Sequence, residues 1–130
     1  MIVLDTHIWL WWVNLERTRL KSSWIREIES SSLVGVSAIS CFEVAWLERH
    51  GRIDLPCQRK EWFEKALSGS GIELLAITPE IAGIAVDLPE HHSDPQDRLI
   101  IATAISFDAL LISADGKFPL YAELEGRLLD

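Results

Sequence analysis

Short apolar runs alternate with longer amphipathic stretches along this chain. Four runs have the length and composition of buried strands: residues 2–4, 33–37, 72–77 and 109–113. Strands that are apolar on both faces are typical of parallel sheets covered by helices on each side. The pattern therefore predicts an α/β protein with a three-layer α/β/α fold and a mainly parallel central sheet. No repeat, linker or low-complexity tract divides residues 1–130, so we expect one domain.

The stretches between these runs have helical spacing. Leu20, Trp24 and Ile28 recur every four residues and give one segment an apolar face. Residues 99–105 are apolar on nearly every side, so that helix must be buried. We expect helices over residues 6–13, 18–30, 40–50, 60–68, 79–88 and from 95 through 105.

Residues that begin and end helices support these bounds. Ser40 is expected to cap the helix that stops at Gly51, which would place Glu43 at the third helical position. Pro79 fits the first position of its helix. Asp94 is expected to cap the buried helix, with Pro95 at its first position.

Composition fits a globular protein of the cytoplasm. Hydrophobic residues make up 48% of the chain and charged residues 25%, which argues against disorder. Cys41 and Cys57 belong to no C-x-x-C pair, so we expect free thiols in a reducing compartment. The apolar amino terminus lacks a basic leader, and no apolar run approaches the roughly 20 residues of a membrane span.

The net charge of −8 opposes binding to nucleic acid, whose phosphates attract basic proteins. The basic residues are nevertheless gathered in two stretches, at residues 17–26 and 49–60. If four of the acids surrounded two divalent ions, the loaded protein would carry a net charge of about −4. The charge therefore weakens a nucleic-acid function without excluding it.

Four dispersed acids are expected at one edge of the sheet. Asp5 follows the first strand and Asp115 lies two residues after the fourth. Glu43 lies near the start of the helix after the second strand, and Asp97 near the start of the buried helix that leads into the fourth strand. The carboxyl ends of parallel strands meet at one edge, where sites commonly form, so these side chains should converge.

Crowded carboxylates repel one another unless a cation lies between them. Mg²⁺, with Mn²⁺ as a substitute, is the natural occupant, because hard ions prefer carboxylate, water and phosphate oxygens. One or two such ions activate water and stabilise charge on a scissile phosphate. The set Asp5, Glu43, Asp97 and Asp115 therefore predicts a metal site for cutting phosphodiester bonds.

Each acid also has a structural interpretation. Asp5 could cap the helix that follows it, and Glu43 could close a capping box with Ser40. Asp115 and Gly116 form a turn pair. Asp94 is assigned to capping alone and left outside the catalytic set. Four acids at one edge of the sheet are harder to explain by capping than any one of them.

The segment DPQDRLIIATA at residues 94–104 is a fairly specific pattern. It occurs here in order with VLDTH at residues 3–7, Ser37-x-x-Ser40-x-x-Glu43 and Ser113-Ala114-Asp115. This combination, which spans residues 1–121, resembles PIN-domain proteins, and in particular the VapC-type toxins of bacterial toxin–antitoxin pairs.

The resemblance implies a Mg²⁺-dependent endoribonuclease, often a homodimer, that is silenced by a cognate antitoxin. The family's acids correspond to Asp5, Glu43, Asp97 and Asp115, and its hydroxyl positions to Thr6 and Ser113. Transfer RNA is a common substrate class among such proteins. Two other functions stay open: a PIN-fold protein-binding module without activity, and an Asp-dependent phosphatase. The phosphatase is disfavoured because His7 stands where a second Asp is usual.

Other residues are candidates for contact with a substrate or a partner protein. Arg49 and Arg52 could contact the RNA backbone or merely solubilise the surface. Arg98 is expected to form an ion pair, with a phosphate contact as the second interpretation.

His7 is expected to pack on its helix, and the histidines at residues 91 and 92 are expected to lie in a loop. A first helix this short cannot bury Trp9, Trp11 and Trp12 together, so one of them is expected at a dimer or antitoxin surface, with base stacking the less favoured role.

Overall fold

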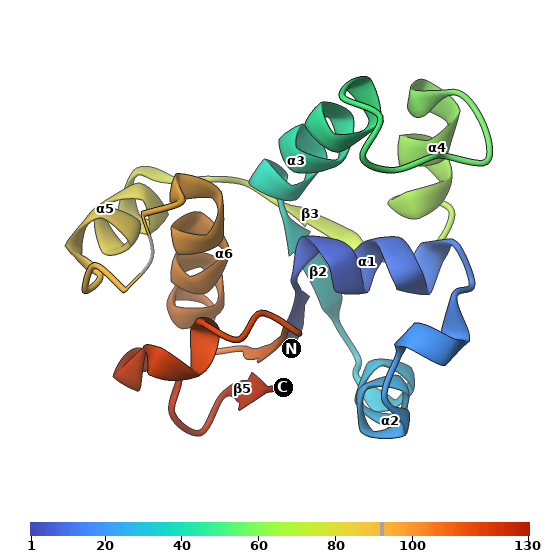
Figure 1. Cartoon of the computed structure of the whole chain (residues 1–130). Coiled ribbons are helices and arrows are strands. Elements are labelled where there is room, and N and C mark those ends of the chain that lie inside the picture. Colours follow the sequence, from blue (N-terminus) through green and yellow to red (C-terminus); the bar gives the residue numbers. More distant parts are fainter. Residues whose placement is uncertain (92) are drawn as a thin grey trace.

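The computed structural model describes residues 1–91 and 93–130 and has a five-stranded, wholly parallel sheet at its centre (Figure 1). The strand order is β3-β2-β1-β4-β5. The strands are β1 (Ile2–Leu4), β2 (Val34–Ser37), β3 (Glu73–Leu75), β4 (Leu110–Ile112) and β5 (Leu128–Leu129). The helices are α1 (Thr6–Val13), α2 (Ser22–Ser30), α3 (Ala38–Arg49), α4 (Arg59–Ala66), α5 (Pro79–Asp87) and α6 (Pro95–Ser106).

Alternate residues of the central strand β1 pack into two separate hydrophobic cores, one on each face of the sheet. Ile2 and Leu4 pack with α1, α2 and α4 on one face of the sheet, whereas Val3 points to the other face. That second face is covered by α6, with α5 packed outside it, and by two 3₁₀ turns near the carboxyl end (Figure 1). The buried α6 confirms the expectation from its apolar composition. The three-layer α/β/α prediction is confirmed.

The second helix is shorter than predicted. Its apolar face is correct, because Leu20, Trp24 and Ile28 are all buried. The α-helix begins only at Ser22, however, after a 3₁₀ turn over Arg17–Arg19. Leu20 has an extended backbone (φ −100°, ψ 132°), which breaks the helix that the spacing of the apolar residues suggested.

The start of α3 corrects the predicted capping box. Ser37, rather than Ser40, is the N-cap, and its Oγ accepts a hydrogen bond from the Ile39 amide at 3.3 Å. Ser40 therefore lies inside the first turn and is fully buried. Glu43 lies three residues further along the helix than predicted, too far from the helix start to close a capping box.

The sheet edges were predicted less well than its centre. Leu33, Ala76 and Ile77 lie outside the strands assigned to them, and all three are exposed. The two-residue β5 was missed, although it pairs with β4 through Leu111–Leu128 and Ile112–Leu129. A two-residue strand has too short an apolar pattern to detect. No helix within residues 1–91 and 93–130 is both long and apolar enough to cross a membrane.

Two glycines should respond oppositely to alanine. A Cβ at Gly35 in β2 would lie 2.8 Å from Leu75 Cδ1 and 3.2 Å from the Glu73 carbonyl, so Gly35→Ala should lower the free energy of unfolding by about 1–3 kcal/mol. A Cβ at Gly83 inside α5 meets nothing within 4 Å, so Gly83→Ala should raise it by about 0.5–1 kcal/mol. Urea unfolding measures both changes. Equal urea midpoints for the two variants would contradict the close packing at Gly35 and the open space at Gly83.

Candidate metal centre

The four predicted acids meet at the carboxyl edge of the sheet, where the strand order changes direction. The chain passes from β1 outward to β2 and β3, then returns to β4 on the opposite side of β1. Asp5 and Asp115 follow these two central strands, which is where ligand sites form in open parallel sheets. A pocket of about 250 Å³ at this edge is lined by Asp5, His7, Trp11, Glu43, Asp97, Ala114 and Asp115.

Asp5 is the most buried of the four acids, with 8% of its surface exposed. Its Oδ1 accepts a hydrogen bond from the Thr6 amide at 2.8 Å, so it does cap α1. Its Oδ2 accepts a second bond from the Ser113 hydroxyl at 2.7 Å. Burial raises the pKa of Asp5, while these hydrogen bonds and nearby His7 oppose the rise. Asp5 therefore combines the capping role with a place in the pocket.

A hydroxyl pair orients Glu43. Thr6 Oγ lies 2.7 Å from Glu43 Oε1 and 2.9 Å from Ser40 Oγ. A threonine hydroxyl has one proton, so it donates to the carboxylate while Ser40 donates back to it. Burial raises the pKa of Glu43, and the Thr6 hydrogen bond lowers it. The expectation that Thr6 supports the acids agrees with these contacts, whereas the contribution of Ser40 was missed because it had been assigned as a cap.

The carboxyl of Asp97 has a strongly raised pKa. Partial burial, followed by the charges of Asp5, Asp94, Glu43 and Asp115, raises the pKa of Asp97 to about 8. At neutral pH this carboxyl therefore holds a proton that any bound cation must displace. Asp94 caps α6 as predicted, its Oδ1 accepting from the Gln96 amide at 2.9 Å. Its charge nevertheless reaches the cluster, which the assignment to capping alone did not anticipate.

Asp115 occupies the turn that its sequence suggested. Its Oδ1 accepts a bond from the Lys117 amide at 2.8 Å, and its own amide donates to Ser113 Oγ at 3.0 Å. Ser113 thus connects Asp115 to Asp5, because the same hydroxyl donates to Asp5. The supporting role predicted for Ser113 agrees with this geometry. The turn places Asp115 on the pocket wall rather than away from it.

The oxygen-rich pocket suits a hard divalent cation, but not a rigid metal cage. No group of three or more His, Cys, Asp or Glu side chains within residues 1–91 and 93–130 is arranged to hold a metal ion by itself. An ion bound here would take one or two carboxylates directly and complete its shell with water or phosphate, as Mg²⁺ commonly does. Burial and the neighbouring negative charges both raise the pKa of Asp97, and a cation bound here would offset both effects.

The three arginines proposed for substrate contact lie in different surroundings. Arg98 donates to the carbonyl oxygens of Val86, Leu88 and Pro89 at 2.7–3.1 Å, which ties the end of α5 to the start of α6. These bonds do not test the ion pair expected for Arg98 or the phosphate contact that was its second interpretation, so both stay predictions. Arg49 is exposed at the end of α3, outside the pocket lining. Arg52 lines a groove beside the pocket.

His7 contacts its own helix, as predicted, through the ring of Trp11, and it also lines the pocket with an exposed side chain. Trp11 lines the same pocket, at a ring distance of 6.1 Å from His7. The expectation that α1 cannot bury all three tryptophans is confirmed: Trp9 is buried, whereas Trp11 and Trp12 are half-buried. His91 packs edge-on against Tyr121 in its loop, and the prediction for His92 lies outside the described residues.

The class of protein follows from this fold, its acids and the match to a family model. Residues 2–124 match the model of the PIN domain. The chain therefore belongs to the PIN-domain family. It is 37% identical over 117 residues to Ribonuclease VapC22 of Mycobacterium tuberculosis, an alignment that covers 89% of this chain and 88% of the relative. The resemblance to VapC-type proteins is thus confirmed.

Solved structures of similar fold come from toxin–antitoxin systems. VapBC2 from Rickettsia felis, bound to a DNA fragment from its promoter, matches with a TM-score of 0.69 at 19% identity, covering 99% of this chain and 98% of that one. A toxin–antitoxin complex from Klebsiella pneumoniae matches with a TM-score of 0.64 at 18% identity, covering 100% and 97%. At these identities the matches support the fold alone.

Asp97 should make the metal-free protein less stable as the pH rises. Its carboxyl stays protonated in the fold until pH about 8, whereas in the unfolded chain it ionises near its ordinary pKa of about 3.9. The free energy of unfolding should therefore fall between pH about 4 and 8. Asp97→Asn removes this fall and should melt above the wild type at pH about 8 in EDTA. Thermal melts across this range measure the effect, and Asp87→Asn, which changes an exposed acid, is the matched control. Parallel pH profiles for wild type and Asp97→Asn would contradict the assignment.

Proposed function

We propose that this protein is a Mg²⁺-dependent endoribonuclease that acts as the toxin of a toxin–antitoxin pair. The observation that carries the proposal is the pocket that gathers Asp5, Glu43, Asp97 and Asp115 from four separate segments. The homology to a VapC ribonuclease supports RNA as the substrate. Mg²⁺ is proposed from the chemistry of the donors, with Mn²⁺ as a substitute and one or two ions bound.

The chain's own residues would prepare the site in three ways. Ser113 and the Thr6 amide fix both oxygens of Asp5, and the Thr6 hydroxyl fixes Glu43. Asp97 and Asp115 complete the negative pocket that attracts the cation. A bound Mg²⁺ would supply an activated water and stabilise the charge that grows on the scissile phosphate. No histidine is required as a general base in this scheme.

RNA is the substrate class, and transfer RNA is a candidate within it. Only a phosphodiester and its neighbouring nucleotides need to reach this open pocket, so the acids themselves select no particular sequence. We place the protein in the cytoplasm, where such RNA is found, and expect a homodimer from the family resemblance. The number of ions and the RNA sequence that is cut are separate questions for experiment.

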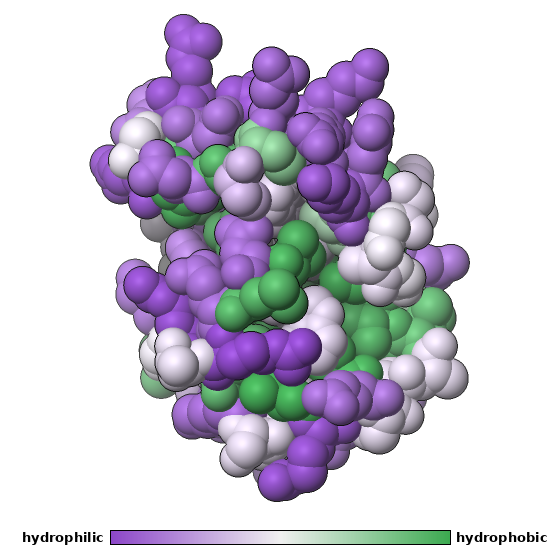
Figure 2. Space-filling model, turned by 90° about the vertical axis from the view of Figure 1, so that its right-hand side faces the viewer, coloured by the Kyte–Doolittle hydropathy of each residue, from purple (hydrophilic) through white to green (hydrophobic). Residues whose placement is uncertain are grey.

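A cognate antitoxin is the second part of the proposal. Figure 2 shows hydrophobic surface across the face that carries the end of α1, between the polar surfaces of α4 and α2. An apolar groove of about 490 Å³ lies there, lined in part by Trp12, Leu15 and Trp62, with Arg17 and Lys65 also in its lining. A partner segment with apolar anchors and acidic flanks would fit this groove.

Two rival functions are distinguished by simple assays. A PIN-fold binding module without activity would bind its partner yet show no metal-dependent cleavage of RNA. An Asp-dependent phosphatase would hydrolyse a generic phosphomonoester, and it lacks support because exposed His7 occupies the position of the second Asp. The four converging acids favour the nuclease over both.

Asp5→Asn and Asp97→Asn should each reduce Mg²⁺-dependent RNA cleavage at least about 100-fold, because a neutral amide is a poor ligand for a hard cation. The fold should survive Asp5→Asn, since an amide oxygen can still cap α1 and the Ser113 hydroxyl can accept as well as donate. Cleavage of a labelled RNA with Mg²⁺ or EDTA measures the loss, with circular dichroism as the folding control. Wild-type rates in both variants would overturn the metal site.

Leu15→Asn should weaken binding of the antitoxin about 10-fold without harming the fold. Leu15 is 72% exposed at the groove and has a left-handed backbone (φ 58°), a conformation that asparagine tolerates better than leucine. Removing an apolar anchor from an interface typically costs about 1–2 kcal/mol. Calorimetry with the protein encoded by the adjacent gene measures the change. Leu120→Asn, at another exposed leucine outside this groove, is the control, and equal affinities for both variants would argue against this docking face.

A further inference from the structure

A second groove opens directly from the acid pocket. It has a volume of about 410 Å³, and its lining shares His7 and Trp11 with the pocket of the four acids. Arg19 and Arg52 also line it, although they come from segments separated by more than thirty residues. The fold thus continues the candidate active site into a track of aromatic and basic side chains.

Each arginine of this groove lies against an indole ring. The guanidinium carbon of Arg19 is 5.7 Å from the Trp11 ring centre, and that of Arg52 is 5.8 Å from the Trp46 ring centre. Trp11 also meets His7 at 6.1 Å with the rings tilted by 55°. Such contacts limit the conformations of the arginines and leave polar N–H groups available to a ligand.

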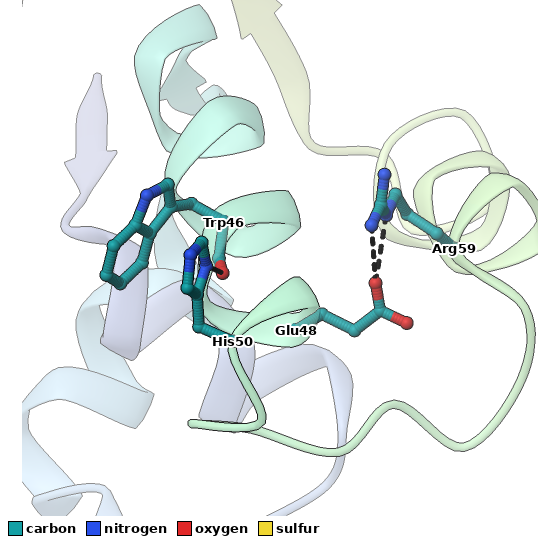
Figure 3. Close-up of polar contacts among 4 residues, drawn as sticks. All are labelled: Trp46, Glu48, His50 and Arg59. Carbon is teal, nitrogen blue, oxygen red and sulfur yellow. Dashed lines mark hydrogen bonds and ion pairs between the residues drawn. The ribbon is translucent and has the colours of Figure 1, made fainter.

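Trp46 and His50 stack on each other beside Arg52 at the carboxyl end of α3. Their rings stack at 4.0 Å with an interplanar angle of 22°, and His50 Nδ1 donates to the Trp46 carbonyl at 2.8 Å (Figure 3). Arg59 donates twice to Glu48 Oε1, at 2.7 and 3.0 Å, which fixes the following loop to the same helix (Figure 3). Arg52 therefore lies beside a stacked pair of rings.

The charges of the groove decide what it can recognise. Glu16 and Asp54 line it beside the two arginines, so its formal charge is balanced. Glu16 pairs with Arg19 at 3.3 Å, but both side chains are largely exposed, and such pairs are weak enough to exchange for a phosphate. A balanced groove cannot hold a duplex by phosphate attraction alone. Attraction must come largely from the aromatic ring, which only an unstacked base can reach.

We propose that this groove binds unpaired nucleotides of an RNA strand next to the scissile phosphate. Trp11 stacks on a base, Arg52 contacts the backbone, and Arg19 exchanges Glu16 for a phosphate. The inference rests on the proposed nuclease function and adds to it the groove and the side chains, Trp11, Arg19 and Arg52, that hold the strand beside the acids.

Binding of fluorescent RNA to variants in an Asp97→Asn background tests the proposal, because cleavage is then silenced. The probes are a 12-nucleotide single strand and the same sequence within a duplex, with Mg²⁺ present. Trp11→Ala should weaken binding of the single strand about 10-fold and leave duplex binding unchanged, whereas Trp11→Phe should retain most of the affinity. Arg52→Gln should reduce the salt dependence of binding by about one ion.

The chain offers a matched control on the opposite groove. Arg17 lies 4.4 Å from the Trp12 ring centre, a cation–aromatic pair of the same kind, and both residues line the apolar groove instead. Trp12→Ala and Arg17→Gln should leave RNA affinity unchanged. Arg52→Gln alters an exposed side chain, so it remains informative if Trp11→Ala fails to fold.

Three results would overturn the inference. If the wild type cleaves RNA but Trp11→Ala and Arg52→Gln bind the single strand like their controls, the groove is wrong and the nuclease stands. If these variants lose only affinity for the antitoxin, the groove is a protein-binding surface. If the wild type cleaves no RNA with Mg²⁺, the nuclease proposal fails and the groove proposal falls with it.

Discussion

The burial of carboxylates in one pocket, together with their mutual repulsion, is the constraint on which the rest of this structure depends. Such charges are tolerated only where hydrogen bonds or a cation compensate them. Ser113 and Thr6 provide the hydrogen bonds for Asp5, and Thr6 provides one for Glu43. The pKa of Asp97 is raised to about 8 by burial and by the charges of its neighbours. The fold therefore stores at this edge an electrostatic strain that a divalent ion would release.

The same residues serve the fold and the site. Asp5 caps α1 while facing the pocket, and Asp115 closes a turn while lining it. Structural and chemical interpretations of an acid are thus not alternatives here. Arg98, next to Asp97, donates to three carbonyl oxygens at the end of α5 and so connects α5 to α6.

The short first helix explains the two surfaces beside the site. It buries Trp9 but cannot also bury Trp11 and Trp12, which emerge into different grooves. Each half-buried ring meets an arginine, Arg19 or Arg17, so the two grooves have similar chemistry but different neighbours. One continues the acid pocket, and the other is mostly apolar. Under the two proposals made for these grooves, one helix would support contacts with both a nucleic acid and a protein.

The sequence by itself determined the three-layer fold, because apolar runs and helical spacing follow directly from which faces must be buried. It also identified the acids, since their order after strands and at helix starts is a local property. It misplaced the cap of α3 and missed β5 and the contact of Ser40 with Thr6. Hydroxyl networks, raised pKa values and grooves arise from contacts between residues distant in the chain, such as Thr6 with Ser40 and Asp5 with Ser113. Only the tertiary structure decides these contacts, because they depend on distances that no local pattern specifies.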